Sequence, residues 1–236
     1  MDHHACSHHD HTSHHHIVGC VSLVPIFNHL PVEQMNEIRQ VVQSISFQKG
    51  ELMYRAGDRS DSLYIVNKGK MKIYRLSESG KEQLIRILQP GDFTGELALF
   101  RQGIHEAYAE AMENSQICQI KSEDLQPLLL KYPSISLKIL SEFANRLDSA
   151  EKQTANVATE KVETRIAMFL VECLEQDQSA SNIIELPMSK KDLASYLGTT
   201  PETLSRRLRE FEDAGYIEQK GQREMKIIDP DKLLLI

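Results

Sequence analysis

The pattern of apolar positions changes twice along this chain. Residues 21–45 carry a short helical signal. It follows Pro31, where apolar side chains have helical spacing at Met35, Ile38, Val41, Val42 and Ile45. Residues 46–122 instead show short apolar or alternating runs, such as SLYIV, KMKIYRL and EQLIRIL, which glycines separate. Short strands with glycine turns predict a sandwich, barrel or jelly roll. From Ser122 onward the pattern is helical again, so we expect an α+β protein.

One long stretch of the second helical region lacks helix breakers. Residues 134–176 contain neither proline nor glycine, and Pro133 precedes them. Apolar residues recur there with heptad spacing, although Ala150 and Thr154 weaken the repeat. We predict a dimerisation helix over 131–160, with a seam made of Leu140, Phe143, Leu147 and Val157. The alternative is a helix that packs only on the core of its own domain.

The C-terminal region predicts two short helices followed by a wing. KKDLASYL is amphipathic, Gly198 suits the end of that helix, and Thr200 with Pro201 suits the start of the next. The segment YIEQKGQREMKIID alternates around Gly221, as a two-stranded wing does. The pattern therefore matches a helix-turn-helix. Ala194 is the small residue where the helices cross, Gly198 makes the turn, and Leu204, Leu208 and Phe211 are the buried positions of the second helix.

The outward face of the second helix carries polar and charged side chains that can contact DNA. Side chains near the start of a recognition helix reach base edges; arginine pairs with guanine and glutamate accepts from cytosine. Hydroxyl groups suit phosphates. The predicted DNA contacts are Thr200, Glu202, Thr203, Ser205, Arg206 and Arg209. The alternative is a helical hairpin whose charged face is only solvated.

Composition narrows the class of protein without changing this picture. The 236 residues are 41% hydrophobic and 26% charged, as in ordinary globular proteins with one or two domains. No apolar run approaches the roughly 18 residues that a membrane helix needs, and no secretory signal is evident, so we expect a cytoplasmic protein without a membrane partner. The net charge of −7 argues against DNA binding by the whole surface, but not by a local patch.

A roll, a long helix and a winged helix, in this order, resemble the CRP/FNR transcription regulators, and among them the FNR-like proteins of FLP type. The resemblance runs from about Val21 to Ile236 and is strongest in AGDRSDSLYIVNKGKMKIY, LQPGDFTGELALF and DLASYLGTTPETLSRRLREF. It implies four parts: a His/Cys-rich segment (1–20), a cyclic-nucleotide-binding-like β-roll (21–130), a dimerisation helix (131–160) and a winged helix-turn-helix (161–236).

The resemblance also implies partners. In this family the pattern E-x-x-S-R, here Glu202, Ser205 and Arg206, is the FNR-type reading head. It implies a homodimer on double-stranded DNA with inverted TTGA-like half-sites, acting with RNA polymerase. Relatives that bind cyclic nucleotides follow GELALF with an arginine and a serine that hold the phosphate. Glu106 and Ala107 stand there instead, so we predict no cyclic AMP binding.

The remaining question is the input that such a regulator senses. The first 20 residues hold eight of the ten histidines and two of the four cysteines. FNR-type proteins carry an iron–sulfur cluster on four cysteines, and Cys118 aligns with the one in their roll. Candidate ligands for such a cluster, for zinc or for another transition metal are Cys6, His8, His11, Cys20 and Cys118. The alternatives are a thiol switch between Cys6 and Cys20, and an idle tail.

We therefore expect a DNA-binding regulator gated by a metal, an iron–sulfur cluster or thiol redox state, and not an enzyme. A cupin-like dioxygenase would need several histidines in the roll, but only His105 lies between 46 and 122. Two further alternatives stay open: a metal-storage protein that uses the His-rich segment, and a regulator with an unidentified small-molecule effector in the β-roll.

Overall fold

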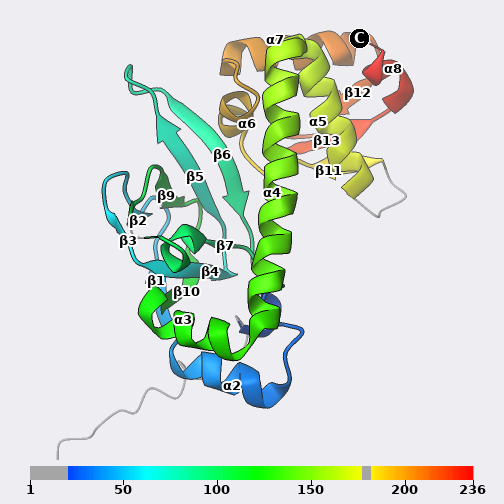
Figure 1. Cartoon of the computed structure of the whole chain (residues 1–236). Helices are drawn as coiled ribbons and strands as arrows, with labels where there is room; N and C mark the ends of the chain where they lie inside the picture. The colour runs from blue at the N-terminus through cyan, green and yellow to red at the C-terminus, as the bar shows by residue number, and fades with distance from the viewer. Residues whose placement is uncertain (1–20, 102, 177–181, 236) are drawn as a thin grey trace, which may run out of the picture. The chain divides into compact units, whose positions relative to one another are not determined.

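A computed structural model describes residues 21–101, 103–176 and 182–235 of the chain (Figure 1). The sequence-based predictions for residues 1–20 lie outside this part. The described chain divides into two compact units. The first contains residues up to Ile73 together with Ile87–Glu142, and the second contains Tyr74–Arg86 and the chain from Phe143 onward.

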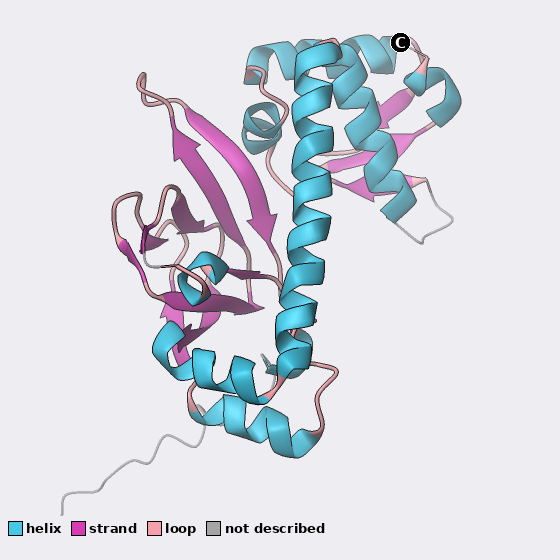
Figure 2. Ribbon diagram, viewed as in Figure 1, coloured by secondary structure: helices cyan, strands magenta, loops and turns pink. Residues whose placement is uncertain are grey.

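Two four-stranded sheets form the β-roll, as the glycine-punctuated pattern predicts (Figure 2). One has the order β1-β10-β4-β7 and the other β2-β9-β5-β6, while β3 and β8 make a separate short ladder. The strands are β1 (Gln43–Phe47), β2 (Leu52–Tyr54), β3 (Arg59–Ser60), β4 (Ser62–Lys68), β5 (Met71–Leu76), β6 (Glu82–Leu88), β7 (Phe93–Thr94), β8 (Gly103–Ile104), β9 (Tyr108–Ala111) and β10 (Ser115–Lys121).

The core of the roll takes its side chains from both of these sheets. Full burial of a valine, leucine, isoleucine, phenylalanine or methionine side chain stabilises a fold by about 1.5–3 kcal/mol. Strand β10 is central because it pairs antiparallel with β1 on one side and with β4 on the other. The buried cluster consists of Tyr54, Tyr64, Val66, Met71, Ile73, Leu88, Ala109, Ala111 and Ile117.

Gly95 makes a turn that no other residue fits. It has a φ of +80° and begins the 3-10 helix η1 (Glu96–Leu99) after β7. A Cβ placed there would collide with the carbonyl oxygen of Ser62 and press on the ring of Tyr64. A positive φ and a backbone collision both oppose a side chain, so the position requires glycine.

We expect Gly95→Ala to lower the free energy of unfolding by about 2–5 kcal/mol, because strain and overpacking add. Urea unfolding followed by circular dichroism measures the change. Gly80→Ala is the matched control: its φ is +78°, but a Cβ there meets nothing within 4 Å. Equal losses for the two variants would show that the close approach to Ser62 contributes nothing.

The helix after Pro31 is shorter than its sequence pattern predicts. Helix α2 spans Val32–Gln40, and Ile45 lies on β1 opposite Ile117. The prediction that Ile45 belongs to the helix is therefore wrong. The β-branched residues Val41, Val42 and Ile45 favour extended backbone, and pairing with β10 decides the outcome over the helical spacing.

Three helices follow the roll: α3 (Ser122–Lys131), α4 (Pro133–Thr159) and α5 (Val162–Gln176). The stretch without proline or glycine thus divides between Thr159 and Val162. Arg165 is buried beside this break, and its Nη1 donates to the carbonyl oxygen of Val157 at 3.0 Å. A charged hydrogen bond of this kind satisfies a carbonyl at the end of α4 and supports the break.

The second unit holds a helix-turn-helix and a three-stranded wing with the order β11-β13-β12 (Figure 1). This arrangement confirms the predicted winged helix-turn-helix. Among the described helices, none combines the length and the apolar composition that a membrane-spanning segment requires. The elements are β11 (Ile183–Glu185), α6 (Lys190–Tyr196), α7 (Pro201–Asp213), β12 (Ile217–Gln219), β13 (Glu224–Ile227) and α8 (Pro230–Leu234).

Candidate nucleic-acid interface

The turn between α6 and α7 has the conformation that its residues predict. Gly198 ends α6 with a φ of +66°. The Thr200 hydroxyl caps α7 by accepting a hydrogen bond from the backbone N–H of Thr203 at 3.2 Å, and Pro201 occupies the first turn. Ala194 and Leu204 are fully buried between the helices. The cap and the buried contact together fix the direction of α7.

Helix α7 has one apolar and one polar face. Leu204, Leu208 and Phe211 are buried against the rest of the unit. The opposite face carries four of the predicted DNA contacts as exposed side chains: Glu202, Ser205, Arg206 and Arg209. They line one shallow depression together with Glu210 and Asp213. The tertiary structure therefore brings the predicted reading residues to one surface.

Three neighbouring arginines of α7 divide between two tasks. Arg207 pairs with Glu210 at 2.6 Å and with Glu163 of α5 at 3.6 Å, so it ties the helix to its own unit. The guanidinium groups of Arg206 and Arg209 form no hydrogen bond or ion pair with any residue the structure describes. Such free guanidinium groups suit bidentate contacts with guanine or phosphate.

Glu202 and the two threonines lie at the first turn of α7. The backbone N–H of Glu202 and the Thr200 hydroxyl hold the pKa of the Glu202 carboxyl below its usual range. The carboxylate is therefore ionised at neutral pH and is an acceptor, as a contact with a cytosine amino group requires. The Thr200 hydroxyl also donates to the Thr203 hydroxyl at 3.2 Å, so both threonines already serve the cap.

A polar cluster that the sequence analysis missed attaches α7 to the wing. The Glu212 carboxylate accepts from the backbone N–H of Gln219 at 2.8 Å and from its amide at 2.9 Å. These bonds lower the pKa of Glu212. Lys190 of α6 donates to the Gln219 side chain at 2.6 Å. Glutamate and glutamine at these spacings are too common on surfaces to predict such a link from sequence.

The predicted dimer seam lies on the exposed side of α4. Leu140, Leu147 and Val157 are 57%, 61% and 45% exposed, and Phe143 is half-buried. The core instead receives Ile135 and Ile139, which are fully buried. Leu140, Leu147 and Val157 therefore remain largely exposed in a single chain.

Cys118 is the one predicted metal ligand within the described chain. It is fully buried on β10, opposite Ser44 of β1 and Ile65 of β4, and it is disulfide-bonded, whereas Cys173 is a free thiol. The other predicted ligands, Cys6, His8, His11 and Cys20, lie outside the described residues, as does the predicted Cys6–Cys20 pair.

The described residues do not fit a metal or an iron–sulfur centre in this state. A disulfide sulfur is not the thiolate that zinc or a cluster requires. Among the residues that the structure describes, no group of three or more His, Cys, Asp or Glu side chains lies close enough to hold a metal ion.

The segment after η1 contains no cation where cyclic-nucleotide-binding relatives have their arginine. Glu106 is exposed, and Ala107 packs against the core of the roll. His105 before them is 7% exposed and stacks on Tyr54 with ring centroids 3.7 Å apart. Burial lowers the pKa of His105 below its usual range, although Asp58 and Asp61 oppose this, so the ring is neutral at pH 7.

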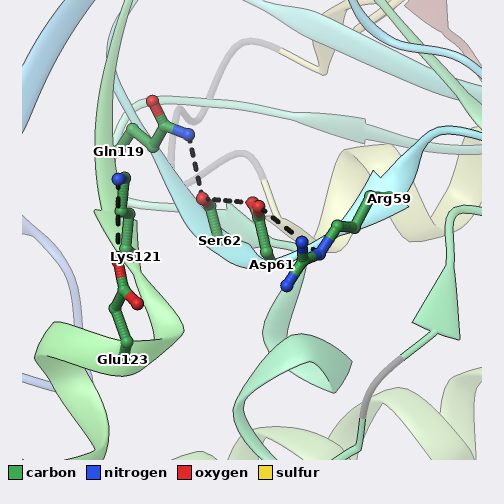
Figure 3. Close-up of polar contacts among 6 residues, drawn as sticks. All are labelled: Arg59, Asp61, Ser62, Gln119, Lys121 and Glu123. Atoms are coloured by element: carbon green, nitrogen blue, oxygen red, sulfur yellow. Dashed lines mark hydrogen bonds and ion pairs between the residues drawn. The ribbon is translucent and has the colours of Figure 1, made fainter.

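A cavity of about 870 Å³ opens between the β3–β8 ladder and the start of α3. Figure 3 shows polar residues beside it: Gln119 donates to Ser62 at 2.9 Å, and Ser62 donates to Asp61 at 2.9 Å. Asp61 faces Arg59 at 3.9 Å, and Lys121 faces Glu123 at 3.6 Å. The lining also includes the exposed apolar Phe100 and Ile104 and the cation Arg101.

Two models of known domain families match this chain. A cyclic nucleotide-binding domain model matches residues 44–132, and a Crp-like helix-turn-helix domain model matches residues 164–236. The chain is 32% identical to a probable transcriptional regulator, Flp, of Lacticaseibacillus casei, over 91% of this chain and 96% of that one. It is 31% identical to an anaerobic regulatory protein of Haemophilus influenzae, over 83% and 76%. FixK2 of Bradyrhizobium japonicum, a solved structure, is 27% identical with a TM-score of 0.71, over 82% and 96%.

Proposed function

Because this chain belongs to the CRP/FNR family of DNA-binding transcription regulators, we propose that α7 reads the bases of an operator with inverted TTGA-like half-sites. The observation that carries this proposal is the exposure of Arg206 and Arg209, without an ion pair to any described residue, beside the ionised Glu202. We assign base contacts to Glu202, Ser205 and Arg206, and phosphate contacts to Thr200, Thr203 and Arg209.

We also propose that the regulator acts as a homodimer joined along α4. A two-fold axis beside this helix would pair the exposed Leu140, Leu147 and Val157 and the half-buried Phe143 with their copies. A dimer presents two recognition helices, as an inverted-repeat operator requires. The proposal includes RNA polymerase as the partner on DNA, action in the cytoplasm, and a division into parts at residues 20, 130 and 160.

For the input we propose thiol redox state, with Cys118 as the buried partner. The disulfide at Cys118 and the free thiol at Cys173 support this choice over a metal. Cys118 would pair with Cys6 or Cys20: two thiols lose two protons and two electrons to an oxidant, and one S–S bond forms. Because Cys118 lies at the centre of the β1-β10-β4 sheet, opening this bond changes the packing of the roll.

The test compares DNA binding by reduced and diamide-oxidised protein. We expect wild-type protein to change its affinity for a TTGA inverted-repeat duplex at least about fivefold between the two states, as for a typical coupling energy. Cys118→Ser should abolish the difference. Cys173→Ser is the matched control, since burial raises the pKa of Cys173 to about 11 and keeps its thiol unreactive.

The outcomes test the redox input and the proposed half-site separately. If Cys118→Ser still responds to diamide, the redox input lies elsewhere. If neither redox state of the wild type prefers the inverted-repeat duplex over a random one, the proposed half-site is wrong. Cys6→Ser and Cys20→Ser identify the second cysteine, because only one of them should behave like Cys118→Ser.

A second candidate input is a small organic anion that binds in the cavity of the roll. The cavity favours it because Asp61 and Glu123 pair with Arg59 and Lys121, which leaves the positive charge of Arg101 beside the apolar Phe100 and Ile104. No cyclic AMP binding is proposed, because Glu106 and Ala107 replace the phosphate-holding pair. A redox-insensitive regulator whose control is lost in Arg101→Ala would favour this candidate over the thiol switch.

A further inference from the structure

The hairpin formed by the ends of β5 and β6 contacts the helix-turn-helix within the second unit. Two hydrogen bonds close the hairpin turn: Ser77 N–H donates to the Lys81 carbonyl at 2.9 Å, and Lys81 N–H donates to the Ser77 hydroxyl at 3.0 Å; Gly80 has a φ of +78°. Strand β6, which leaves this turn, then lies against α6. One residue of α6, Ser195, makes nearly all of the polar contact.

Ser195 bonds to three successive residues of β6. Its hydroxyl donates to the carbonyl oxygen of Glu82 at 2.7 Å and accepts from the backbone N–H of Leu84 at 2.8 Å. Its carbonyl oxygen accepts from the Gln83 side-chain amide at 2.7 Å. Ser195 is half-buried and Leu84 is buried, so water competes poorly for these groups.

The Ser195 hydroxyl takes the place of a neighbouring strand. β6 ends the sheet order β2-β9-β5-β6, so the outward N–H and C=O groups of the strand have no partner in that sheet. Residues 82 and 84 present these groups on the same edge, and one hydroxyl satisfies a carbonyl and an N–H at once. Alanine at this position would leave both backbone groups without that partner.

Ser195 stands close to the turn that sets the direction of α7. The next residue, Tyr196, accepts from Gln153 of α4 at 3.2 Å and places its ring 5.8 Å from that of Phe169 in α5. The C-terminal end of α6 is thus held by α4, α5 and the hairpin. These contacts leave Arg206 and the rest of the reading face exposed, so they are compatible with DNA binding.

From this geometry we infer that Ser195 is a positioning residue for DNA recognition, through which the β5–β6 hairpin holds α6 and hence α7. The inference rests on the proposed role of α7 in reading DNA. The hairpin is continuous with the roll, because β5 begins at Met71 and β6 ends at Leu88, both in the first unit. A change in the roll that shifts these strands therefore acts on the reading helix through Ser195.

The test uses two variants of the full-length protein that break the contact from opposite sides. Ser195→Ala removes both hydroxyl bonds, and Gln83→Ala removes the amide bond without altering the helix-turn-helix. Ser195→Thr keeps the hydroxyl. Ser149→Ala is the matched control, since the Ser149 hydroxyl donates to the carbonyl oxygen of Asn145 in its own helix and to no other described residue. The DNA is a duplex that wild-type protein selects from a random pool, with an unselected duplex for comparison.

We expect Ser195→Ala to weaken binding to the selected duplex about three- to tenfold, with Gln83→Ala at the lower end, and to leave binding to the unselected duplex unchanged. Hydrogen exchange at the Leu84 amide should accelerate in Ser195→Ala. The double variant Ser195→Ala/Gln83→Ala should lose less affinity for the selected duplex than the product of the two single losses, because both substitutions open one contact. Ser195→Thr and Ser149→Ala should bind as wild type does.

Each contrary result overturns the inference. Unchanged exchange at Leu84 in Ser195→Ala would show that the hydroxyl does not hold the strand in solution. Faster exchange with unchanged affinity would show a contact that does not position the reading helix. Equal losses on both duplexes, together with a lower melting temperature, would show that Ser195 only stabilises the unit. A wild-type protein that selects no duplex from the pool would instead overturn the proposed DNA reading itself.

Discussion

Replacing Arg206 by alanine is expected to weaken operator binding by about 1–3 kcal/mol at each half-site and to relax the preference for bases there. The guanidinium is exposed, forms no hydrogen bond or ion pair with the described residues, and lies beside Glu202 and Ser205 on α7. A bidentate contact with a guanine is lost entirely when the side chain is truncated. Two half-sites double the energetic effect in a dimer.

Fluorescence anisotropy with four duplexes that differ at one half-site position measures this effect. Wild-type protein should distinguish them, whereas Arg206→Ala should bind all four alike. Arg207→Ala is the control on the neighbouring residue, because Arg207 pairs with Glu163 and Glu210 and should affect only stability. A uniform loss in Arg206→Ala, with the preference intact, would reassign Arg206 to a phosphate contact.

The double variant Leu140→Glu/Leu147→Glu is expected to dissociate the dimer and to lower operator affinity at least about a hundredfold. In a symmetric dimer each substituted residue lies near its own copy, so four carboxylates would share one apolar seam. Both leucines are more than half exposed in a single chain, so the substitutions leave the core of each unit untouched.

Analytical ultracentrifugation gives the mass of the particle, and anisotropy gives the affinity. Leu130→Glu is the matched control, because Leu130 of α3 is 85% exposed but lies outside the predicted heptad. The control should remain dimeric. A wild-type chain that sediments as a monomer, or a double variant that stays dimeric, would remove α4 as the dimer helix.

Residue types and spacings were sufficient to predict the helix-turn-helix. Gly198, Thr200 and Pro201 act through their own backbone preferences, and the structure has each of them in the predicted role. The reading face follows as well, since residues on one side of a 3.6-residue period must share a surface once Leu204 and Leu208 are buried.

Long-range pairing accounts for what the sequence analysis missed. Ile45 fits a helical spacing and lies on a strand, because β10 pairs with it from a distant part of the chain, at Ile117. Ser195 and Gln219 are ordinary polar residues, and nothing local distinguishes them from solvated ones. Their roles arise from Leu84 and Glu212, which only the folded chain brings to them.

From the residue pattern alone follow the order of roll, long helix and winged helix, the set of residues on the outer face of α7, and the presence of Glu106 rather than an arginine before Ala107. These features depend on local periodicity, turn chemistry and single residue identities. The folded chain was needed to show that Cys118 is buried in a disulfide, that Arg207 is paired whereas Arg206 has no ion pair with a described residue, and that Ser195 bonds to a strand edge. The physical reason is that hydrogen bonds and ion pairs depend on distances of about 3 Å between atoms of distant residues, which no local pattern encodes.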